Sequence, residues 1–208
     1  MSNEIRPVTD EQQFELLIEG LIGQEYGCCD HFFPPDMIQG LRENLLAYRE
    51  AGLMHPAGVG KKFDYQKNTA IRGDAIYWID KDAQNELEAR FIQKIEHFIQ
   101  YLNASCYTNI DDYEFHYAYY EPNSFYRRHL DQFKSDRGRQ YSLVIYLNDN
   151  WQATDGGSLS LYIGENTLSV SPEAGRVVFF KSDQTEHEVH AAPQRPRLSI
   201  AGWLKRTS

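Results

Sequence analysis

The spacing of hydrophobic residues divides the chain into two parts that meet near residue 110. In the first part, apolar residues recur every three or four positions, which is the spacing of one face of an amphipathic helix. This spacing predicts a helix capped by Asp10, a second helix over residues 36–52 and a third over residues 82–105. The third has the clearest stripe, which comprises Leu87, Phe91, Ile95, Phe98 and Leu102.

Several segments between these helices lack the helical period. Residues 28–35, CCDHFFPP, are interpreted as a short extended piece that two prolines end. Residues 53–72 have no period and contain glycines and a proline, so we expect a mobile loop there. A short strand is expected near residues 76–79, before the third helix begins.

From residue 113 the period becomes two, as in a strand whose two faces differ. In YEFHYAYY (residues 113–120) and YSLVIYLN (residues 141–148), the odd positions form an apolar face. The even positions of the first segment are more polar: Glu114, His116, Ala118 and Tyr120. Further strand-like segments follow, separated by turn residues. The pattern therefore predicts helices packed on one face of a sheet, while the other, partly polar face closes into a small sandwich or barrel.

Composition narrows the class of protein. A chain of 208 residues suits one domain. The formal net charge of −9 argues against general binding to nucleic acid or to an anionic membrane, because phosphate groups need a local excess of Lys and Arg. No apolar run approaches the roughly 20 residues of a transmembrane helix. The polar N-terminus shows no signal peptide, and three cysteines without a Cys-x-x-Cys pattern indicate a reduced, cytoplasmic chain.

The stretch YRRHLDQF, residues 126–133, contains the first candidates for chemistry. Residues i and i+2 of a strand point the same way, so His129 and Asp131 would project an imidazole and a carboxylate into one space. A His-x-Asp pair alone is common and does not define a metal site. A third ligand must come from elsewhere, and the candidates are His187 and His190 in TEHEVHAAP.

Two histidines and one carboxylate on one side of a metal leave three coordination positions free, as in non-haem iron(II) oxygenases. These positions can hold a bidentate 2-oxoacid and dioxygen. The far carboxylate of 2-oxoglutarate would then need a fixed cation, for which the planar fork of Arg suits better than Lys. Alternation along RLSIAGW places four residues on one face: Arg197, Ser199, Ala201 and Trp203.

This joint pattern resembles a known family, the iron(II)- and 2-oxoglutarate-dependent prolyl 4-hydroxylases of the type that modify hypoxia-inducible factor, with their bacterial relatives. The similarity covers residues 25–205 and is carried by YEPNSFYRRHLD, RQYSLVIYLNDNW, DGGSLSLY, GRVVFFKSDQTEHEVHAA and RLSIAGWL. It implies an α+β, mainly β fold with a double-stranded β-helix (jelly-roll) core and supporting helices packed on one sheet. It also implies one dioxygenase domain over residues 1–208, in which residues 1–105 are mainly helical support and residues 106–208 form the core.

By position, the resemblance assigns His129, Asp131 and His187 to iron(II). It assigns Arg197 to the far carboxylate of 2-oxoglutarate, with Tyr146 hydrogen-bonding that carboxylate. Three further residues would line the cosubstrate pocket: Tyr120, Leu159 and Trp203.

The resemblance also concerns the substrate. Residues 56–72 correspond to the family's mobile substrate-covering loop, and three residues match positions near its substrate groove: Arg72, Asp74 and Arg139. His190 does not match the family pattern. The spacing from His187 to Arg197 is one residue longer than in animal members, which leaves the register between these two strands open and Arg195 as a weaker substitute.

The implied reaction is C4 hydroxylation of a prolyl residue in a protein, with release of succinate and carbon dioxide and with ascorbate as a supporting reductant. Elongation factor Tu is the expected class of target in bacterial members. Two alternatives stay open: the same chemistry on a free amino acid or small molecule, and a non-catalytic jelly-roll binding module. The long loop and a basic rim favour a peptide; the rim comprises Arg127, Arg128, Lys134, Arg137 and Arg139.

Overall fold

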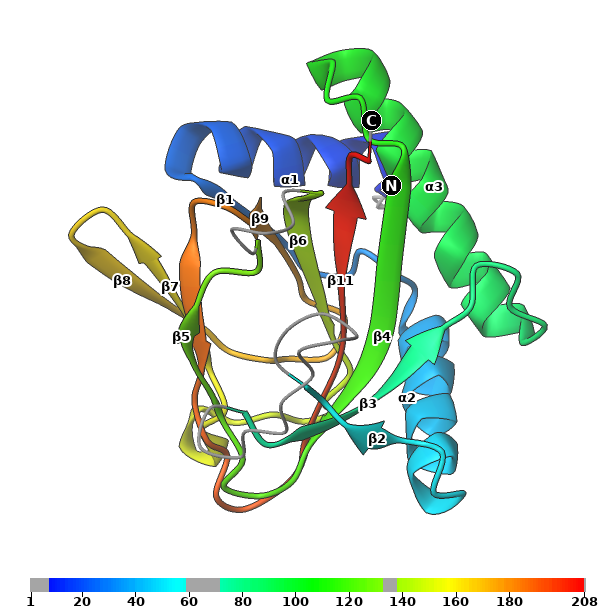
Figure 1. The fold of residues 1–208 in the computed structure, drawn as a ribbon, viewed down its shortest axis with the longest axis vertical. Helices are drawn as coiled ribbons and strands as arrows, with labels where there is room; N and C mark the ends of the chain where they lie inside the picture. The colour runs from blue at the N-terminus through cyan, green and yellow to red at the C-terminus, as the bar shows by residue number, and fades with distance from the viewer. Residues whose placement is uncertain (1–7, 59–71, 133–137, 208) are drawn as a thin grey trace, which may run out of the picture.

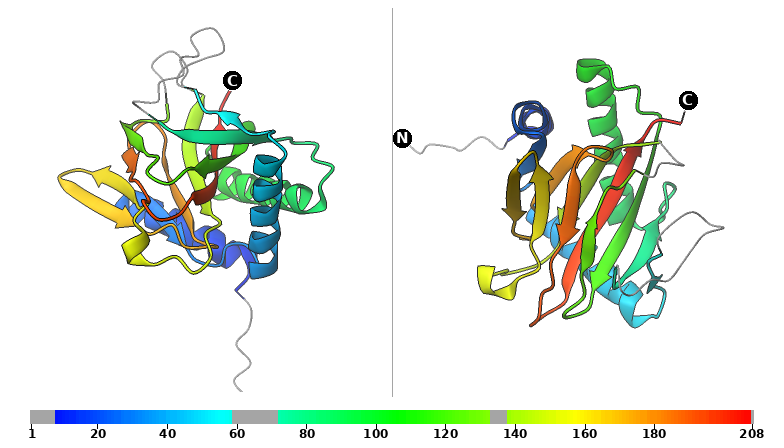
Figure 2. Two further views of the ribbon diagram at one scale, coloured as in Figure 1. Left: turned by 90° about the horizontal axis from the view of Figure 1, so that it is seen from below. Right: turned by 60° about the vertical axis from the view of Figure 1, so that its left-hand side comes forward.

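The computed structural model describes residues 8–58, 72–132 and 138–207. Two antiparallel sheets face each other, and helices pack on the outer face of the larger sheet (Figure 1, Figure 2). This arrangement confirms the predicted fold class, which is mainly β with a jelly-roll core and supporting helices on one sheet. None of the helices in these ranges has the length and apolar character needed to cross a membrane.

The larger sheet has the strand order β1-β9-β6-β11-β4-β3-β2. Its strands are β1 (Tyr26–Cys29), β2 (His55–Pro56), β3 (Asp74–Ile79), β4 (Asp112–Tyr120), β6 (Arg139–Tyr146), β9 (Val177–Lys181) and β11 (Arg197–Lys205). Both edges come from the first half of the chain, because β1 pairs with β9 and β3 pairs with β4. The first 105 residues therefore complete the sheet as well as supporting it, and their grouping with the core into one domain stays a prediction.

The smaller sheet has the order β5-β10-β7-β8. Its strands are β5 (Tyr126–His129), β7 (Leu159–Ile163), β8 (Asn166–Val170) and β10 (Glu186–Val189), and the short 3-10 helix η1 (Ala153–Asp155) precedes β7. His187 lies on β10 and Arg197 on β11, so the two residues belong to different sheets. The sequence left open how these two strands align. Because β10 and β11 are not paired with each other, that question does not apply.

The helices are α1 (Asp10–Gln24), α2 (Pro35–Glu50) and α3 (Glu86–Cys106). The predicted cap of α1 was wrong by one residue, because Thr9 is the cap rather than Asp10. The Thr9 hydroxyl accepts from the backbone N–H of Gln12, and the Gln12 side chain accepts from the N–H of Thr9. This reciprocal capping box satisfies two donors at once, which a cap at Asp10 would not do.

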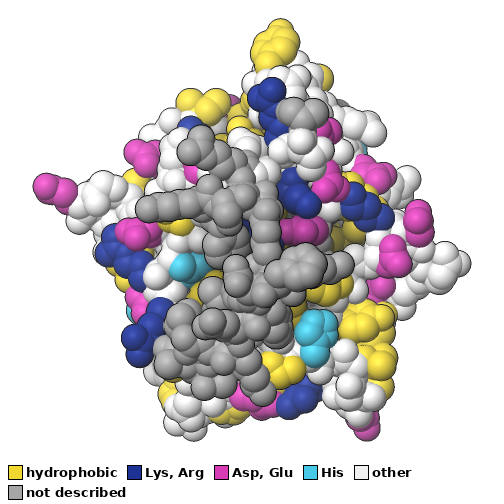
Figure 3. Space-filling model, viewed as in Figure 1, with side chains coloured by type: hydrophobic (Ala, Val, Ile, Leu, Met, Phe, Trp, Pro, Cys, Tyr) yellow, Lys and Arg dark blue, Asp and Glu magenta, His cyan; other side chains and the backbone are white. Residues whose placement is uncertain are grey.

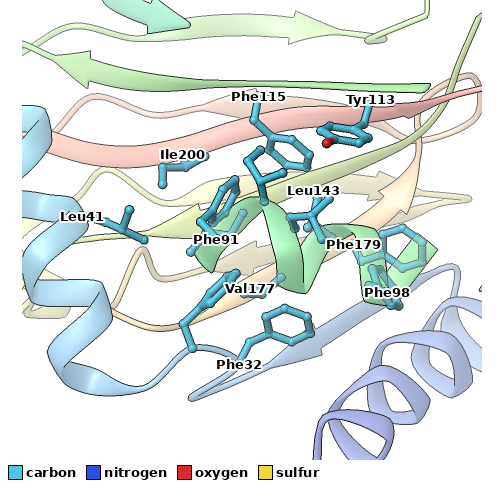
Figure 4. Close-up of a cluster of buried hydrophobic side chains, with 14 of the residues drawn as sticks. Phe32, Leu41, Phe91, Phe98, Tyr113, Phe115, Leu143, Val177, Phe179 and Ile200 are labelled. Carbon is cyan, nitrogen blue, oxygen red and sulfur yellow. The ribbon is translucent and has the colours of Figure 1, made fainter. Parts of the chain in front are cut away.

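The predicted apolar stripe of α3 packs on the helix-facing side of the larger sheet. Phe91 and Phe98 point from α3 toward the sheet residues Phe115 and Phe179 (Figure 4). The ring centroids are 5.3 Å apart both for Phe91 with Phe115 and for Phe98 with Phe179. The odd positions of β4 and β6 belong to this core, so the period-two prediction for these strands is confirmed.

The even positions of the same strands face the smaller sheet. A second apolar cluster lies there and includes Ala118, Tyr120, Tyr146, Leu159 and Phe180. The predicted loop at residues 53–72 contributes β2 at its start, and residues 59–71 lie outside the described residues. The space between the two sheets is where the candidate side chains meet.

Candidate active site

A cavity lies between the two sheets, and both sheets line it. The smaller sheet contributes His129, Leu159 and His187. The larger sheet contributes Tyr120, Arg197 and Trp203, among others. The structure thus brings together residues from separate parts of the chain that the sequence analysis had grouped by chemistry.

Three side chains of the types that ligate metals, His129, Asp131 and His187, converge in this cavity. The Nε2 atom of His129 lies 3.5 Å from Oδ1 of Asp131, and Nε2 of His187 lies 3.5 Å from Oδ2 of Asp131. One ligand atom from each residue lies within 4.8 Å of the others. Transition metals bind imidazole nitrogen and carboxylate oxygen at about 2.1 Å, so one ion fits among these atoms. Two imidazoles and one carboxylate are the donor set of non-haem iron(II) oxygenases.

The pairing of β5 with β10 explains why the two histidines meet. In that antiparallel pair His129 lies directly opposite His187, and the ring centroids are 4.2 Å apart. The expectation that Asp131 lies on the same strand as His129 was wrong, because β5 ends at His129. Asp131 lies in the bend that follows, where its carbonyl accepts from Nη1 of Arg139 at 3.3 Å. The bend, rather than strand alternation, directs the carboxylate.

Backbone carbonyls orient both imidazoles. The Nδ1–H of His129 donates to the carbonyl of Arg127 at 2.6 Å, and the Nδ1–H of His187 donates to the carbonyl of Thr185 at 3.2 Å. A carbonyl can only accept, so these contacts assign the proton to Nδ1 and leave the lone pair on Nε2. Both Nε2 atoms face Asp131. This tautomer is the one that binds a metal through Nε2.

Asp131 is only 8% exposed, and its Oδ2 accepts from the Ser142 hydroxyl at 2.7 Å. Burial by itself would raise the pKa of the Asp131 carboxyl, but His187, His129 and the Ser142 hydroxyl hold that pKa well below its usual range. Burial lowers the pKa of His187 to about 4. At neutral pH the site therefore presents a carboxylate and a neutral His187, which are the protonation states that metal binding requires.

Arg197 lies in the cavity wall away from this cluster. Ser142, the partner of Asp131, pairs with Trp203 near the end of β11, whereas Arg197 is the first residue of that strand. Arg197 is 2% exposed, and its Nε donates to the carbonyl of Gly157 at 2.9 Å. Gly157 has a φ of 67°, and a Cβ there would lie 3.4 Å from Cδ of Arg197. Glycine at this position permits the backbone turn, and it leaves room for Trp151 and Ala192, which would lie 3.0 and 3.1 Å from a Cβ here.

Two buried polar atoms near Arg197 have no hydrogen-bond partner among the described residues: Nη2 of Arg197 and the hydroxyl of Tyr146. The guanidinium carbon lies 5.0 Å from the Tyr146 ring centroid and 5.2 Å from that of Tyr120. Burial raises the pKa of Tyr146 to about 12, so its hydroxyl keeps its proton. An unpaired buried donor costs about 1–3 kcal/mol. A carboxylate would satisfy both donors, so these residues fit the far end of 2-oxoglutarate.

Arg72 and Asp74 form a bidentate ion pair beside the cavity, with Nε–Oδ1 and Nη2–Oδ2 distances of 2.7 and 2.6 Å. The Arg72 guanidinium lies 4.3 Å from the ring centroid of Tyr126, which in turn stacks on His129 at 3.5 Å. Arg72 and Tyr126 line the cavity, whereas Asp74 does not. The stack of guanidinium, phenol and imidazole was not anticipated from the sequence.

The predicted basic rim is largely neutralised where the structure describes it. Arg128 pairs with Glu186, and Arg139 donates from Nε and Nη2 to Oε1 of Glu114 at 3.0 and 2.7 Å. Arg139 also lies 3.4 Å from the ring centroid of Trp203. Figure 3 shows basic and acidic side chains interleaved on this face of the molecule. Lys134 and Arg137 lie outside the described residues, so charge alone does not identify a partner.

The two alternative candidates lie away from the cavity wall. His190 follows the end of β10 and is exposed, with its Nε2 2.7 Å from the Ser160 hydroxyl. Arg195 contacts Asp155 at 3.5 Å and donates to the carbonyl of Asp149 at 3.0 Å. The structure therefore brings His187 rather than His190 to Asp131. It brings Arg197 rather than Arg195 to the cavity.

His116 is a cavity-lining residue whose importance the sequence analysis missed. It is 3% exposed on β4, and its Nδ1 has no hydrogen-bond partner within the described part of the chain. Its ring centroid lies 4.9 Å from Trp78 and 5.4 Å from Trp203. Burial, followed by the charge of Arg72, lowers the pKa of His116 to about 3. The signal in the sequence was its place on the polar face of YEFHYAYY.

Comparison with known proteins defines the class. The family model of the 2OG-Fe(II) oxygenase superfamily matches residues 115–205. The crystal structure of a Pseudomonas putida prolyl-4-hydroxylase is 33% identical in sequence, with a TM-score of 0.84; the match covers 94% of this chain and 100% of that one. The fold and the donor set agree with this match, and the chain belongs to the 2OG-Fe(II) oxygenase superfamily.

Within that class, the chain is similar to prolyl hydroxylases, as the motifs had indicated. The hypoxia-inducible factor prolyl hydroxylase of Caenorhabditis elegans is 31% identical over 203 residues, which cover 91% of this chain and 28% of that protein. The chain thus spans about a quarter of the length of this curated relative. A Trichoplax adhaerens prolyl hydroxylase, solved with a hypoxia-inducible factor peptide, shares the fold with a TM-score of 0.84 at 24% identity, over 94% of this chain and 90% of that one.

The buried His116 predicts a specific pH dependence of stability. Its pKa is about 3 in the folded chain, against 6.5 for an unperturbed histidine, so the unfolded chain binds more protons between these values. The free energy of unfolding should therefore fall as the pH falls through this window. Between about pH 7.5 and 5.5, metal-free wild type should lose about 1 kcal/mol more than His116→Asn in denaturant titrations. Equal losses would show that His116 is protonated in the folded protein.

Proposed function

We propose that the chain hydroxylates a prolyl residue of a protein or peptide at C4, using iron(II), 2-oxoglutarate and dioxygen, with release of succinate and carbon dioxide. One observation carries this function: a single cavity holds both a His-Asp-His donor set and a pair of unpartnered buried donors. The first fits iron(II), and the second fits the far carboxylate of 2-oxoglutarate. The names of the C. elegans and P. putida relatives support proline as the target.

We assign iron(II) to His129, Asp131 and His187. Bound iron and 2-oxoglutarate would supply the activation of dioxygen, which no protein side chain performs. The chain's own contribution is to orient the three metal-ligating side chains before iron binds. The carbonyls of Arg127 and Thr185 fix the two imidazoles, and the neighbouring Ser142 hydroxyl fixes the carboxylate.

We assign the far carboxylate of 2-oxoglutarate to Nη2 of Arg197 and the hydroxyl of Tyr146. The Gly157 carbonyl holds Nε of Arg197, so the guanidinium is oriented before the cosubstrate arrives. Such preorganisation lowers the entropy lost on binding. The cosubstrate would then lie along Tyr120 and Leu159, with Trp203 as the inner wall.

The substrate we propose is a proline-containing protein, with elongation factor Tu as the target class expected for a bacterial member of the family. Arg72, Asp74 and Arg139 are the residues we propose near the substrate: Arg72 lines the cavity, and Asp74 anchors its guanidinium. Ascorbate would keep the iron in its reduced state. We place this activity in the cytoplasm, where the free thiols of the chain would stay reduced.

The direct test is incubation of the purified chain with iron(II), 2-oxoglutarate, oxygen and end-capped peptides that cover the prolines of bacterial elongation factor Tu. Succinate is followed by NMR and each peptide by mass spectrometry. Succinate release together with the addition of one oxygen atom to proline is the expected result. Stimulation by free amino acids but by no peptide would instead favour a small-molecule substrate. A protein that binds metal yet never consumes 2-oxoglutarate would be a binding module.

The metal assignment predicts that Asp131→Ala lowers iron(II) affinity by at least about 100-fold, because one of three ligands is lost. Turnover of 2-oxoglutarate should disappear with it. Metal content after anaerobic reconstitution, measured by elemental analysis, checks the first effect. His190→Ala is the control and should keep its iron. Normal iron content in Asp131→Ala, or loss of iron in His190→Ala, would contradict the assignment.

The cosubstrate assignment predicts that Arg197→Ala raises the KM for 2-oxoglutarate by about 10- to 100-fold, since charge-assisted hydrogen bonds contribute about 1.5–3 kcal/mol each. Iron content should stay that of wild type. Arg195→Ala removes the same charge two residues away and should leave this KM within about twofold, because Arg195 bonds Asp155 and the Asp149 carbonyl and does not line the cavity. The opposite pattern would place the cosubstrate at Arg195.

A further inference from the structure

One polar side chain in the cavity wall is needed neither for the metal nor for 2-oxoglutarate. His116 lies on β4 in the larger sheet, whereas His129 and His187 lie on β5 and β10 in the smaller sheet. It is nevertheless almost completely buried, and its Nδ1 lacks a partner among the described residues. Buried polar groups are nearly always hydrogen-bonded in native proteins, so an exception in a cavity wall points to a ligand.

The surroundings of His116 position its ring firmly. On β3 its cross-strand neighbour is Trp78, and on β11 it is Ala201. The ring packs against the indoles of Trp78 and Trp203, whose own centroids are 6.4 Å apart, so the three rings form one aromatic cluster. Ala201, the cross-strand neighbour on β11, contributes only a methyl group to the wall beside it. The imidazole is therefore held by aromatic neighbours, while its neighbour on β11 is a small residue.

A second unpartnered atom lies close to the first. Nε1 of Trp203 is buried and, like Nδ1 of His116, has no partner in the described ranges; the two ring centroids are 5.4 Å apart. Indole N–H is a donor only, whereas a neutral imidazole offers one donor and one acceptor. Burial and the charge of Arg72 keep His116 neutral near pH 7, since its pKa is about 3. The matching ligand is a neutral group that includes an acceptor oxygen.

We propose that His116 is a specificity-determining residue that, together with Trp203, binds a main-chain amide of the peptide substrate beside the target residue. A peptide amide is uncharged and presents a carbonyl acceptor and, outside X-Pro bonds, an N–H donor. The carbonyl oxygen, which has two lone pairs, accepts from Nε1–H of Trp203 and from Nδ1–H of His116. This inference rests on the proposed function, because it takes the substrate to be a peptide.

The test compares His116→Leu with His116→Asn, which have almost the same shape and differ in polarity. The Asn side chain can place a polar atom near the position of Nδ1, and Leu cannot. With the elongation factor Tu peptides, His116→Leu should raise the peptide KM about 10-fold and His116→Asn less than about threefold. The KM for 2-oxoglutarate and the iron content should not change. His190→Leu, which removes an exposed histidine, is the matched control and should behave as wild type.

Thermal stability separates recognition from a purely structural role. Without substrate, Asn leaves a buried amide unpaired, so His116→Leu should melt at the same temperature as His116→Asn or higher. Recognition by His116 thus predicts that substrate affinity and stability rank the two variants in opposite order. If peptide KM instead follows melting temperature, or if His116→Leu keeps the wild-type peptide KM, the inference is wrong.

A variant of Trp203 tests the second half of the proposed amide site. Trp203→Phe keeps an aromatic ring but removes the Nε1–H, and it should raise the peptide KM about 5-fold. If His116→Leu does not fold, Trp203→Phe serves as the test in its place. An unchanged peptide KM in Trp203→Phe would overturn the proposal that Trp203 and His116 together bind an amide. Failure of the proposed function looks different, because then wild type itself turns over no peptide.

Discussion

The larger sheet has to bury both of its faces, and each face is covered by a different kind of structure. Helices cover one face with a wholly apolar layer, in which Phe91 and Phe98 meet Phe115 and Phe179. A smaller sheet covers the other face, but it leaves a cavity. Side chains from both sheets then share a space from which bulk water is largely removed. The His-Asp-His group, Arg197 and the unpaired polar atoms all lie beneath this second layer.

Within the cavity, the polar groups fall into two kinds. Some are fully satisfied by the protein, as when the Ser142 hydroxyl donates to Asp131 and the Gly157 carbonyl accepts from Arg197. Others have no partner in the described residues, such as Nη2 of Arg197 and Nδ1 of His116. The satisfied groups orient the reactive ones, while the unsatisfied groups are expensive unless a ligand completes them. Polar groups with protein partners therefore support the architecture of the site, and polar groups without partners mark where ligands would bind.

Stacking connects the cavity to its surroundings. Arg72 lies over the ring of Tyr126, and Tyr126 stacks on His129. Arg72 is itself bonded to Asp74, so this stack holds the His129 imidazole in place. On the other side Arg139 lies over Trp203 and also donates to the carbonyl of Asp131. These contacts make the imidazole and the carboxylate parts of rigid assemblies. Preorganisation of this kind is what positions small ligands within fractions of an ångström.

The alternation of residues along β4, β6 and β11 was readable from the sequence, because side-chain direction in a strand depends only on position parity. It determined the two sheet faces and the inward placement of Arg197, while the helical period determined the apolar stripe of α3. The sequence motifs also singled out the triad residues and the family. Only the tertiary structure decided what parity cannot specify. Asp131 is directed by a bend beyond β5, His187 is selected over His190 by the pairing of β10 with β5, and His116 is left unpaired by neighbours from β3 and β11. Each of these depends on contacts between distant segments, which no local pattern encodes.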